Sequence, residues 1–566
     1  MVICRYSKIK KLSACFFAIL FVVWFFNTPL AVAQTDSGSN NTPSFQGLTT
    51  ETTQRNYQRI IPLTSPVYRE LDRLYLLAGK ARPSLSRPWS ADEAKKIMEE
   101  LPENFLDSVP DSVIIIKREI GFGNENTGPQ KMAFKVSPEI NIEGHVKTNN
   151  NRKEWEHGYE ERPPLINIPL ELWLFPNWYM NVEFAQKQDH AIVNKTNNYV
   201  NLSLSPREYD WSTPFRAFMS VGGERWNVQA GRDKISWGAG VTGNMMVSDY
   251  SDFYNLVRLT TYWNRFKFTA VYMGFEPWLT DQEIEYGIAN NGLGGPYTDF
   301  EELFKAHLGK RIEIRILDNL SFAITETSMF GNKHINITEL NPIMYYHNLF
   351  TPEYSNVMMG FDVDYTPFSG LNIYLQYAID EFSDADPGGE GKPRAMGYLG
   401  GFTYIRQAFD GFMTFNLEAA LTDPYLYNRW HPNTRFTNRR RIERYDWVNK
   451  PIGYRHGPDA VIINGAVQYE KPGRYMAGIS VRYSLLGEMN DSLDYAGSYD
   501  IRNGINRRLS GTVERNRVTR CHGTIQITDR ISVASDIYYV RIDNYQNLRS
   551  NTINDLEVAT SVRFKL

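Results

Sequence analysis

Cysteine is scarce in this sequence. Its 566 residues include three cysteines, and two of them, Cys4 and Cys15, lie in an N-terminal segment that we expect to be removed. Cys521 alone would remain in the mature chain, which excludes an intrachain disulfide and a cysteine-based metal cluster there. No cysteine follows the expected cleavage site, so a lipoprotein anchor is not expected either.

Long apolar runs are also rare. The run from Leu12 to Phe26 is shorter than the roughly 20 residues that a membrane-spanning helix needs. Basic residues precede it and Ala31-Val32-Ala33 follows it, which predicts a cleaved signal peptide over residues 1–33 and therefore an exported chain. An uncleaved anchor helix is the alternative. The polar residues 34–56 predict a flexible linker.

Catalytic motifs are missing as well. The patterns H-E-x-x-H, G-x-S-x-G and the P-loop do not occur. The formal charge of −3 gives no reason to expect a nucleic-acid partner. We therefore expect a protein that is not an enzyme and holds no cofactor and no metal ion. The alternative is an enzyme that uses Ser and His in the wall of a barrel.

Residues 57–120 carry helical patterns. Ser65 and Pro66 are typical of an N-cap followed by proline at the first helical position. Ser90 and Glu93 predict a capping box at the start of a second helix. We expect a small α-helical periplasmic domain whose apolar stripe lies against the mouth of a barrel.

From residue 131 to residue 566 the pattern changes to alternation of apolar and polar residues. It is clear in residues 311–316 and again in the final residues, 557–566. A period of two indicates strands with one apolar and one polar face. The mean hydropathy of −0.43 argues against a bundle of apolar helices. The last strand resembles the C-terminal insertion signal of bacterial outer-membrane proteins, and we expect it to pair with the first strand near Ile140 and Ile142.

The connections between the predicted strands alternate strictly in length. Short turn signals separate long polar segments along the chain, and together they join about 18 strands, with residues 198–205 interpreted as loop rather than as a further strand. Such a layout is typical of outer-membrane barrels, which have short periplasmic turns and long outer loops. We therefore predict an all-β transmembrane barrel of about 18 antiparallel strands over residues 131–566. The turn signals lie at Pro176-Asn177, Gly222-Gly223, Asn264-Arg265, Asp318-Asn319, 367–370, Asp410-Gly411, 471–473 and Thr528-Asp529.

Two outer-loop segments combine aromatic and polar residues. In the first, glycines flank Arg232, Asp233 and Trp237, which suggests an aromatic platform for a sugar with hydrogen-bonding groups beside it. The alternative is a loop that folds into the lumen and closes it. The second segment extends from Glu326 to His347, and its Tyr and Asn side chains suit either sugar hydroxyls or loop packing.

The longest loop, residues 422–459, is basic. It holds eight Arg and Lys against four Asp and Glu, so its net charge is +4. Such a loop attracts anions, and outside a cell these are acidic polysaccharide and lipid-linked phosphate. The alternative is pairing of these cations with carboxylates of the lumen. The candidate ligand-binding residues here are Arg439, Arg440, Arg441, Arg455 and His456.

The same segments resemble the Wzi-type outer-membrane capsule-assembly family. The resemblance rests on Gly231-Arg232-Asp233 followed by Trp237-Gly238-Ala239-Gly240, on Asn341-Pro342, on Gly453 to Asp459, and on Arg87-Pro88-Trp89-Ser90 near the N-terminus. It covers about residues 60–566. It implies an 18-stranded barrel with a helical bundle on its periplasmic side, acting as a non-enzymatic lectin that helps attach capsular polysaccharide to the cell surface.

The combined hypothesis is a monomer in the cell outer membrane that binds surface or capsular polysaccharide through its outer loops. Outer-membrane lipid would surround it, and the barrel-assembly machinery would be its partner during insertion. A porin or solute channel is the first alternative, and a structural or adhesive surface protein is the second.

Overall fold

A computed structural model describes residues 58–121, 132–175, 177–194, 196–203, 205–290, 304–331, 335–349, 354–381, 394–429, 431–442, 446–491 and 509–566. The predicted signal peptide and linker, residues 1–33 and 34–56, lie outside the described residues. Residues Thr52–Leu566 form one compact unit. That unit is described below.

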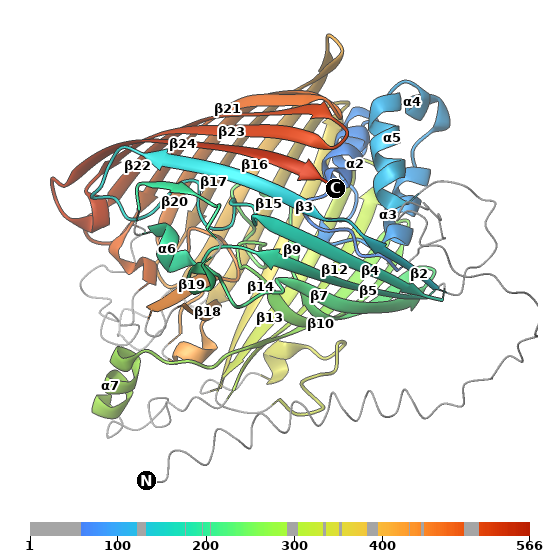
Figure 1. The fold of residues 1–566 in the computed structure, drawn as a ribbon. Coiled ribbons are helices and arrows are strands. Elements are labelled where there is room, and N and C mark those ends of the chain that lie inside the picture. The colour runs from blue at the N-terminus through green and yellow to red at the C-terminus, as the bar shows by residue number, and fades with distance from the viewer. Residues whose placement is uncertain are drawn as a thin grey trace, which may run out of the picture. The chain divides into compact units, whose positions relative to one another are not determined.

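Antiparallel strands close into a barrel in this unit (Figure 1). We call each position around the barrel wall a stave, whether one strand or two consecutive strand pieces occupy it. The first stave consists of two pieces, β2 and β3, which both pair with β4. A short strand, β6 (Asn198–Val200), pairs with β3 and is not counted as a stave. Counted in this way the barrel has 18 staves, which confirms the predicted antiparallel barrel of about 18 strands. The interpretation of residues 198–205 as loop is wrong for Asn198–Val200, which form β6, although β6 adds no stave. In chain order the strands are β2 (Met132–Val136) and β3 (Glu139–Lys147), β4 (Ile166–Leu174), β5 (Trp178–Gln186), β7 (Arg216–Gly223), β8 (Trp226–Asp233), β10 (Tyr254–Trp263), β11 (Phe266–Phe275), β12 (Lys305–Leu317), β13 (Leu320–Gly331), β14 (Ser355–Phe368), β15 (Leu371–Glu381), β16 (Ala395–Ala408), β17 (Gly411–Thr422), β20 (Ala460–Lys471), β21 (Tyr475–Leu486), β22 (Glu514–Thr528), β23 (Ile531–Asp543) and β24 (Thr552–Lys565).

The last strand closes the barrel against the first. In the register of β24 with β3, Phe564 is opposite Ile140 and Val562 is opposite Ile142. The two strands run side by side in Figure 1. The predicted pairing is therefore confirmed. From Glu557 to Lys565 the last strand is paired with β3, so that the sheet closes and this stretch is not an open edge.

The wall of the barrel has an apolar outer face and a polar inner face. On β12, Ile312 and Ile314 point outward and are exposed, whereas Arg311 and Glu313 point inward and are buried. Exposed Ile, Leu, Val and Phe side chains recur at outward positions of most other staves. An outer apolar band of this kind is what a barrel in a lipid bilayer presents to the acyl chains. No helix among the described residues is long and apolar enough to span a membrane.

Four helices lie over the end of the barrel that carries the short turns (Figure 1): α2 (Pro66–Leu77), α3 (Ala91–Glu99), α4 (Glu103–Asp107) and α5 (Pro110–Ile120). The hydroxyl of Ser90 accepts the backbone N–H of Glu93 as predicted, at 3.2 Å. The Glu93 carboxylate, however, accepts from Lys267 of β11 at 2.6 Å and so ties α3 to the barrel wall. Ile405 and Phe412, next to a short turn, belong to the same apolar cluster as the helices. The apolar stripe is thus covered by the barrel mouth.

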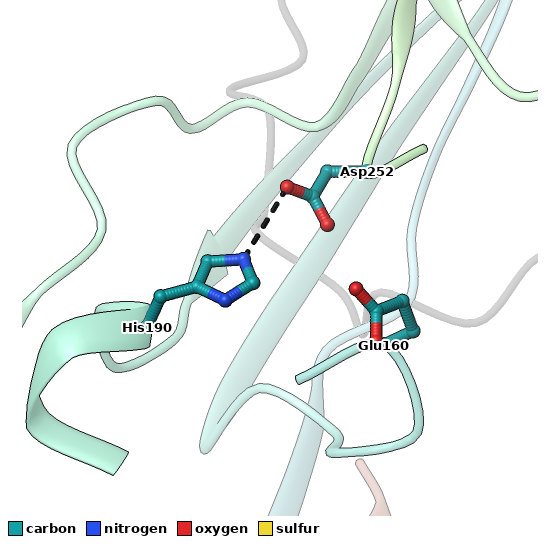
Figure 2. Close-up of side chains that lie close together, drawn as sticks. All are labelled: Glu160, His190 and Asp252. Atoms are coloured by element: carbon teal, nitrogen blue, oxygen red, sulfur yellow. Dashed lines mark ion pairs between the residues drawn. The ribbon is translucent and has the colours of Figure 1, made fainter. Parts of the chain in front are cut away.

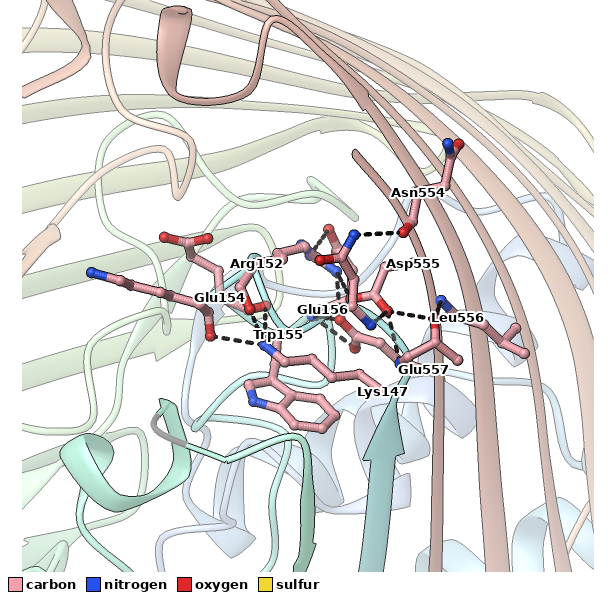
Figure 3. A network of polar contacts seen from close by, with 12 residues as sticks. Lys147, Arg152, Glu154, Trp155, Glu156, Asn554, Asp555, Leu556 and Glu557 are labelled. Atoms are coloured by element: carbon pink, nitrogen blue, oxygen red, sulfur yellow. Dashed lines mark hydrogen bonds and ion pairs between the residues drawn. The ribbon is translucent and has the colours of Figure 1, made fainter. Parts of the chain in front are cut away.

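At the other end, the first long loop is fixed to the closing strand (Figure 3). Asp555 and Glu557 point inward from β24. Glu557 accepts from the backbone N–H groups of Glu156 and His157 at 2.9 and 3.2 Å, and from the Arg152 guanidinium at 2.5 Å. Because these carboxylates are buried and fully engaged, the loop lies within the barrel and not above it.

Candidate functional site at the long-loop end

Two loops fill the lumen. The segment between β8 and β10 contributes Trp237 and Met245, and the segment between β17 and β20 contributes Tyr427 and Tyr454, to one buried apolar cluster with inward side chains of the barrel wall. The Tyr427 hydroxyl donates to the carbonyl of Met245 at 2.6 Å and joins the two loops. Their combined volume forms a packed core inside the barrel.

We call this core of two loop segments, which carry Trp237 and Met245 and Tyr427 and Tyr454, the plug. A segment from the short-turn end of the barrel also belongs to it. β1 (Ser86–Arg87) follows α2 in the chain, and it pairs with β9 (Ser236–Trp237), so that Ser86 is opposite Trp237. The N–H of Gly238 also donates to the carbonyl of Leu85 at 3.0 Å. A segment from the helical side and a loop from the opposite side therefore meet within the lumen and hydrogen-bond to each other.

Trp237 belongs to this plug. Its side chain is 1% exposed. Gly309 of β12 has no side chain and so leaves room for the indole, since a Cβ at this position would lie 3.0 Å from the ring. The prediction that Trp237 is a sugar platform is wrong for this arrangement, because a fully packed ring presents no face to a ligand. The alternative interpretation, a loop that folds into the lumen and closes it, agrees with the buried position of Trp237.

A cavity of about 410 Å³ lies over the plug, at the outer ends of β8, β10 and β11. It brings together four of the predicted residues, Arg232, Arg439, Arg440 and Arg441. We call it the arginine cavity. Five basic residues and two acidic residues line it, so the lining charge is five minus two, or +3.

Two of the arginines hold the cavity in shape. They lie on β18 (Thr437–Ile442), which forms a hairpin with β19 (Asp446–Pro451). Arg439 donates to both carboxylate oxygens of Glu283 in α7 (Asp281–Asn290), at 2.5 and 2.9 Å. Arg440 donates to Asp210 at 2.6 Å and contacts Asp252 at 2.8 Å. Both side chains are mostly buried, so they position neighbouring loops more than they face solvent.

Other lining side chains are at least partly exposed. Arg441 is exposed. Arg232 is partly exposed, and its guanidinium donates to the side-chain oxygen of Asn255 at 3.0 Å and to the carbonyls of Ser212 and Pro214 at 2.6 and 3.1 Å. Trp211 is 70% exposed. Its indole N–H donates to the carbonyl of Pro206 at 2.9 Å, which fixes the orientation of the ring. Trp278 also lines the cavity. The cavity thus offers aromatic faces next to guanidinium groups.

The remaining predicted residues lie elsewhere. Asp233 is buried and accepts from Arg216 at 2.9 Å, so it is part of the inner wall. Arg455 lies 3.6 Å from Glu161 and over the ring of Tyr250. His456 follows it, and burial together with the charges of Arg482 and Arg455 holds the pKa of its imidazole well below its usual value. Asp233, Arg455 and His456, which the sequence also suggested as ligand-binding residues, therefore do not line the arginine cavity.

Below the cavity, Glu160, His190 and Asp252 point toward one another (Figure 2), with His190 at the start of α6 (His190–Asn194). Ligand atoms of these three residues lie within 4.8 Å of each other, as in a cation site. The ammonium group of Lys450 contacts both carboxylates, however, and Arg440 contacts Asp252 as well. Burial alone would raise the pKa of Asp252, but these cations and His190 outweigh it and hold that pKa well below its usual value. The protein's own cations thus neutralise this cluster.

A second, smaller cavity of about 310 Å³ lies at the ends of β13 to β15. Its lining includes Glu326, Tyr345 and His347 from the second predicted segment, together with Arg429 of the longest loop. The side chains of that segment therefore line a hollow. The loop that carries the arginines of the first cavity also forms a wall of this one.

Sequence reasoning missed Trp211 and Trp278. Each is an isolated tryptophan in a long polar loop, and neither stands near a glycine pattern of the kind that drew attention to Trp237. Their position in predicted outer loops could have identified them as candidate ligand-binding residues, since an aromatic residue there either packs inward or is offered to a ligand.

The fold and its filled lumen define the class: the chain is an outer-membrane-type β-barrel whose loops pack inside it. No family model matches the sequence, and no curated protein matches it. Among solved structures, it is similar to Wzi from Escherichia coli, described as an outer membrane protein involved in group 1 capsule assembly and a carbohydrate-binding β-barrel. That match has a TM-score of 0.55 and 12% identity, and it covers 89% of this chain and 99% of that chain.

A weaker match is OprD from Pseudomonas aeruginosa, with a TM-score of 0.38 and 10% identity over 78% of this chain and 97% of that chain. A TM-score at this level carries no argument. The likeness to Wzi confirms the expected resemblance at the level of the fold.

Proposed function

We propose that this protein is a non-enzymatic lectin of the outer membrane, which binds an acidic surface polysaccharide in the arginine cavity and helps to hold it at the cell surface. The single observation that carries the proposal is the cavity itself, which is lined by two exposed side chains, Arg441 and Trp211. The carbohydrate-binding neighbour with the same fold supports it.

The size and the lining suit a few sugar residues of a chain. The volume of about 410 Å³ lies within the range of about 300 to 1,000 Å³ that is usual for ligand sites. Aromatic rings stack on the apolar face of a sugar, and guanidinium groups donate paired hydrogen bonds to carboxylate or phosphate. The lining charge of +3 favours an acidic glycan over a neutral one.

The packed plug supports retention of a polymer over passage of solutes. Two loops and β1 pack against one another inside the barrel and fill the lumen, which a channel for solutes would need to keep open. We propose that the protein acts as a monomer, is inserted by the barrel-assembly machinery, is surrounded by outer-membrane lipid, and needs neither cofactor nor nucleic acid.

The experiment that tests this function compares cells that carry the gene with cells that lack it. Surface polysaccharide is stained on the cells and measured in the medium. We expect loss of the gene to move glycan from the surface to the medium, and we expect the Trp211→Ala/Arg441→Gln variant to fail to restore it although it inserts normally. Unchanged surface glycan in the deletion strain would contradict the proposal.

A further inference from the structure

Three arginines form a patch on the outer surface of the barrel wall, apart from both cavities. Arg515 and Arg517 lie on β22 and Arg541 lies on β23. All three are exposed, and the side chains of Arg517 and Arg541 are 54% and 47% exposed. Their neighbours Val518 and Val540 are buried on the lumen side. Because side chains alternate along a strand, the arginines point outward, toward lipid.

The pairing of the two strands places like charges opposite each other. In the register of β22 with β23, Arg517 is the cross-strand partner of Arg541, and Arg515 is the partner of Asp543. Asp543 is shared: its carboxylate lies 3.4 Å from Arg541 and 3.9 Å from Arg517. Three cations and one anion leave a charge of +2. Like charges directly opposite one another destabilise a sheet unless an anion lies between them.

The patch lies at the edge of the apolar band. On the outward face of β22, exposed Ile527 lies near the short-turn end and Arg517 lies ten positions closer to the long loops. At about 3.3 Å per residue this is roughly 33 Å along the strand, or roughly 25 Å along the membrane normal for a strand tilted by about 40°. An apolar band of that height, about 25 Å, is typical of such barrels. The guanidinium groups therefore lie at the depth of lipid headgroups.

Tyrosines mark the same boundary. Tyr539 precedes Arg541 on the outward face of β23 and is 53% exposed. The guanidinium of Arg517 lies 5.9 Å from the ring centre of Tyr483 on β21. Tyrosines concentrate where apolar acyl chains meet the polar headgroups. Tyr483 is the cross-strand partner of Arg517 and lies level with it, and Tyr539 lies two residues below Arg541, which agrees with the estimated depth.

We propose that Arg515, Arg517 and Arg541 bind the phosphate group of a lipid headgroup in the outer leaflet. Asp543 offsets only part of the repulsion between Arg517 and Arg541, and a phosphate beside them would neutralise the remaining charge of +2. Guanidinium groups bind phosphate oxygens in pairs of hydrogen bonds. The site is separate from the arginine cavity, whose lining contains no residue of β22 or β23. The inference is therefore independent of the proposed function.

Native mass spectrometry of the full-length protein in detergent tests the inference, with lipid A that carries two phosphates as the probe. The variant R515Q/R517Q/R541Q is compared with R406Q/R474Q/R530Q, which removes three exposed arginines near the short turns. We expect at least a tenfold loss of bound lipid in the first variant and no change in the second. Equal binding by the wild type and the first variant would overturn the proposal.

Two further measurements separate the explanations. Inorganic phosphate should not displace the lipid at equal concentration, because the acyl chains add apolar contact; displacement would assign the site to a free anion and overturn the lipid claim.

The single variant R541Q should raise the unfolding temperature without lipid, because it removes the cross-strand repulsion, and should lower the stabilisation that lipid gives. A lower unfolding temperature without lipid would show that Arg541 is a structural partner of Asp543 and contradict the proposal.

Discussion

The ammonium group of Lys450 lies 2.7 Å from the carboxylate of Asp252, and both side chains are buried. Lys450 belongs to the hairpin that carries Arg439 to Arg441, whereas Asp252 belongs to the loop that carries Trp237. This contact joins the floor of the arginine cavity to the plug below it.

Replacement of Lys450 by Met should therefore release the hairpin. Asp252 would keep its contact with Arg440, but the carboxylate of Glu160 would lose its contact with Lys450. Removing one partner of a buried ion pair costs about 3 kcal/mol or more. We expect faster cleavage of the longest loop by trypsin or chymotrypsin while the barrel strands stay protected. Arg474→Gln in an exposed short turn is the matched control, and equal cleavage of the two variants would show that the contact does not hold the hairpin.

Two buried groups of the closed loops, His456 and Asp252, predict how these loops respond to acid. The pKa of His456 is lowered in the folded state, so the unfolded state binds more protons below pH 6.5 and stability falls as the pH drops through that value. The pKa of Asp252 is lowered from 3.8, so its contribution is fully present above that pH and is lost below it.

We expect two steps of loop release in hydrogen exchange measured from pH 7 to pH 3. The first should begin below pH 6.5 and should be weaker in His456→Gln; the second should begin below about pH 4. Each rate is divided by the intrinsic exchange rate at the same pH, because intrinsic amide exchange itself slows as the pH falls. Constant protection of the loop amides between pH 7 and pH 5 after this correction would contradict the first step.

The filled lumen predicts little conductance. Because β9 and β1 pair inside the barrel and Tyr427 and Tyr454 pack around them, ions have no wide path. We expect no stable large conductance from the wild type in planar bilayers, and we expect it to appear when residues 236–247 are replaced by a short Gly-Ser linker. A large stable conductance of the unmodified protein would favour the porin alternative.

The closing seam predicts an assembly defect. Phe564 is opposite both Ile140 of β3 and Ile531 of β23, so removal of Phe564 to Leu566 takes partners from both sides of the last strand. We expect the truncated protein to be absent from the outer-membrane fraction when cells are fractionated. Normal insertion of the truncated chain would show that the seam does not depend on these residues.

The fold was predictable because its signals are local. Alternation with a period of two indicates several of the strands, and turn residues such as Asp318-Asn319 mark the short connections. The approximate number of staves and the pairing of the last strand near Ile140 and Ile142 could therefore be inferred. The cap that Ser90 makes was also predictable, because it joins residues three positions apart. The partner of the Glu93 carboxylate was not predictable, because Lys267 lies on a strand distant in sequence and the two residues meet only in the closed barrel.

The candidate site was predictable only in part. A run of three arginines at 439–441 indicated anion binding, and the structure places them on a cavity with Arg232. The sequence did not show that Arg439 pairs with Glu283 and that Arg440 pairs with Asp210 and Asp252, nor that Arg441 is the most exposed of the three. It favoured Trp237 over Trp211 because glycines surround Trp237, although those glycines permit tight packing of the plug.

Binding of acidic polysaccharide to the purified protein tests the central claim most directly. Affinity is measured at about 0.05 M and about 0.5 M salt for the wild type, Arg441→Gln, Trp211→Ala and the control Arg549→Gln, an exposed arginine of another long loop. Loss of a charged hydrogen bond or of a stacking ring should weaken binding about tenfold in each of the two cavity variants. The account predicts that result, with weaker binding at high salt and an unchanged control. Equal affinity of all four proteins, or no binding by the wild type, would contradict it.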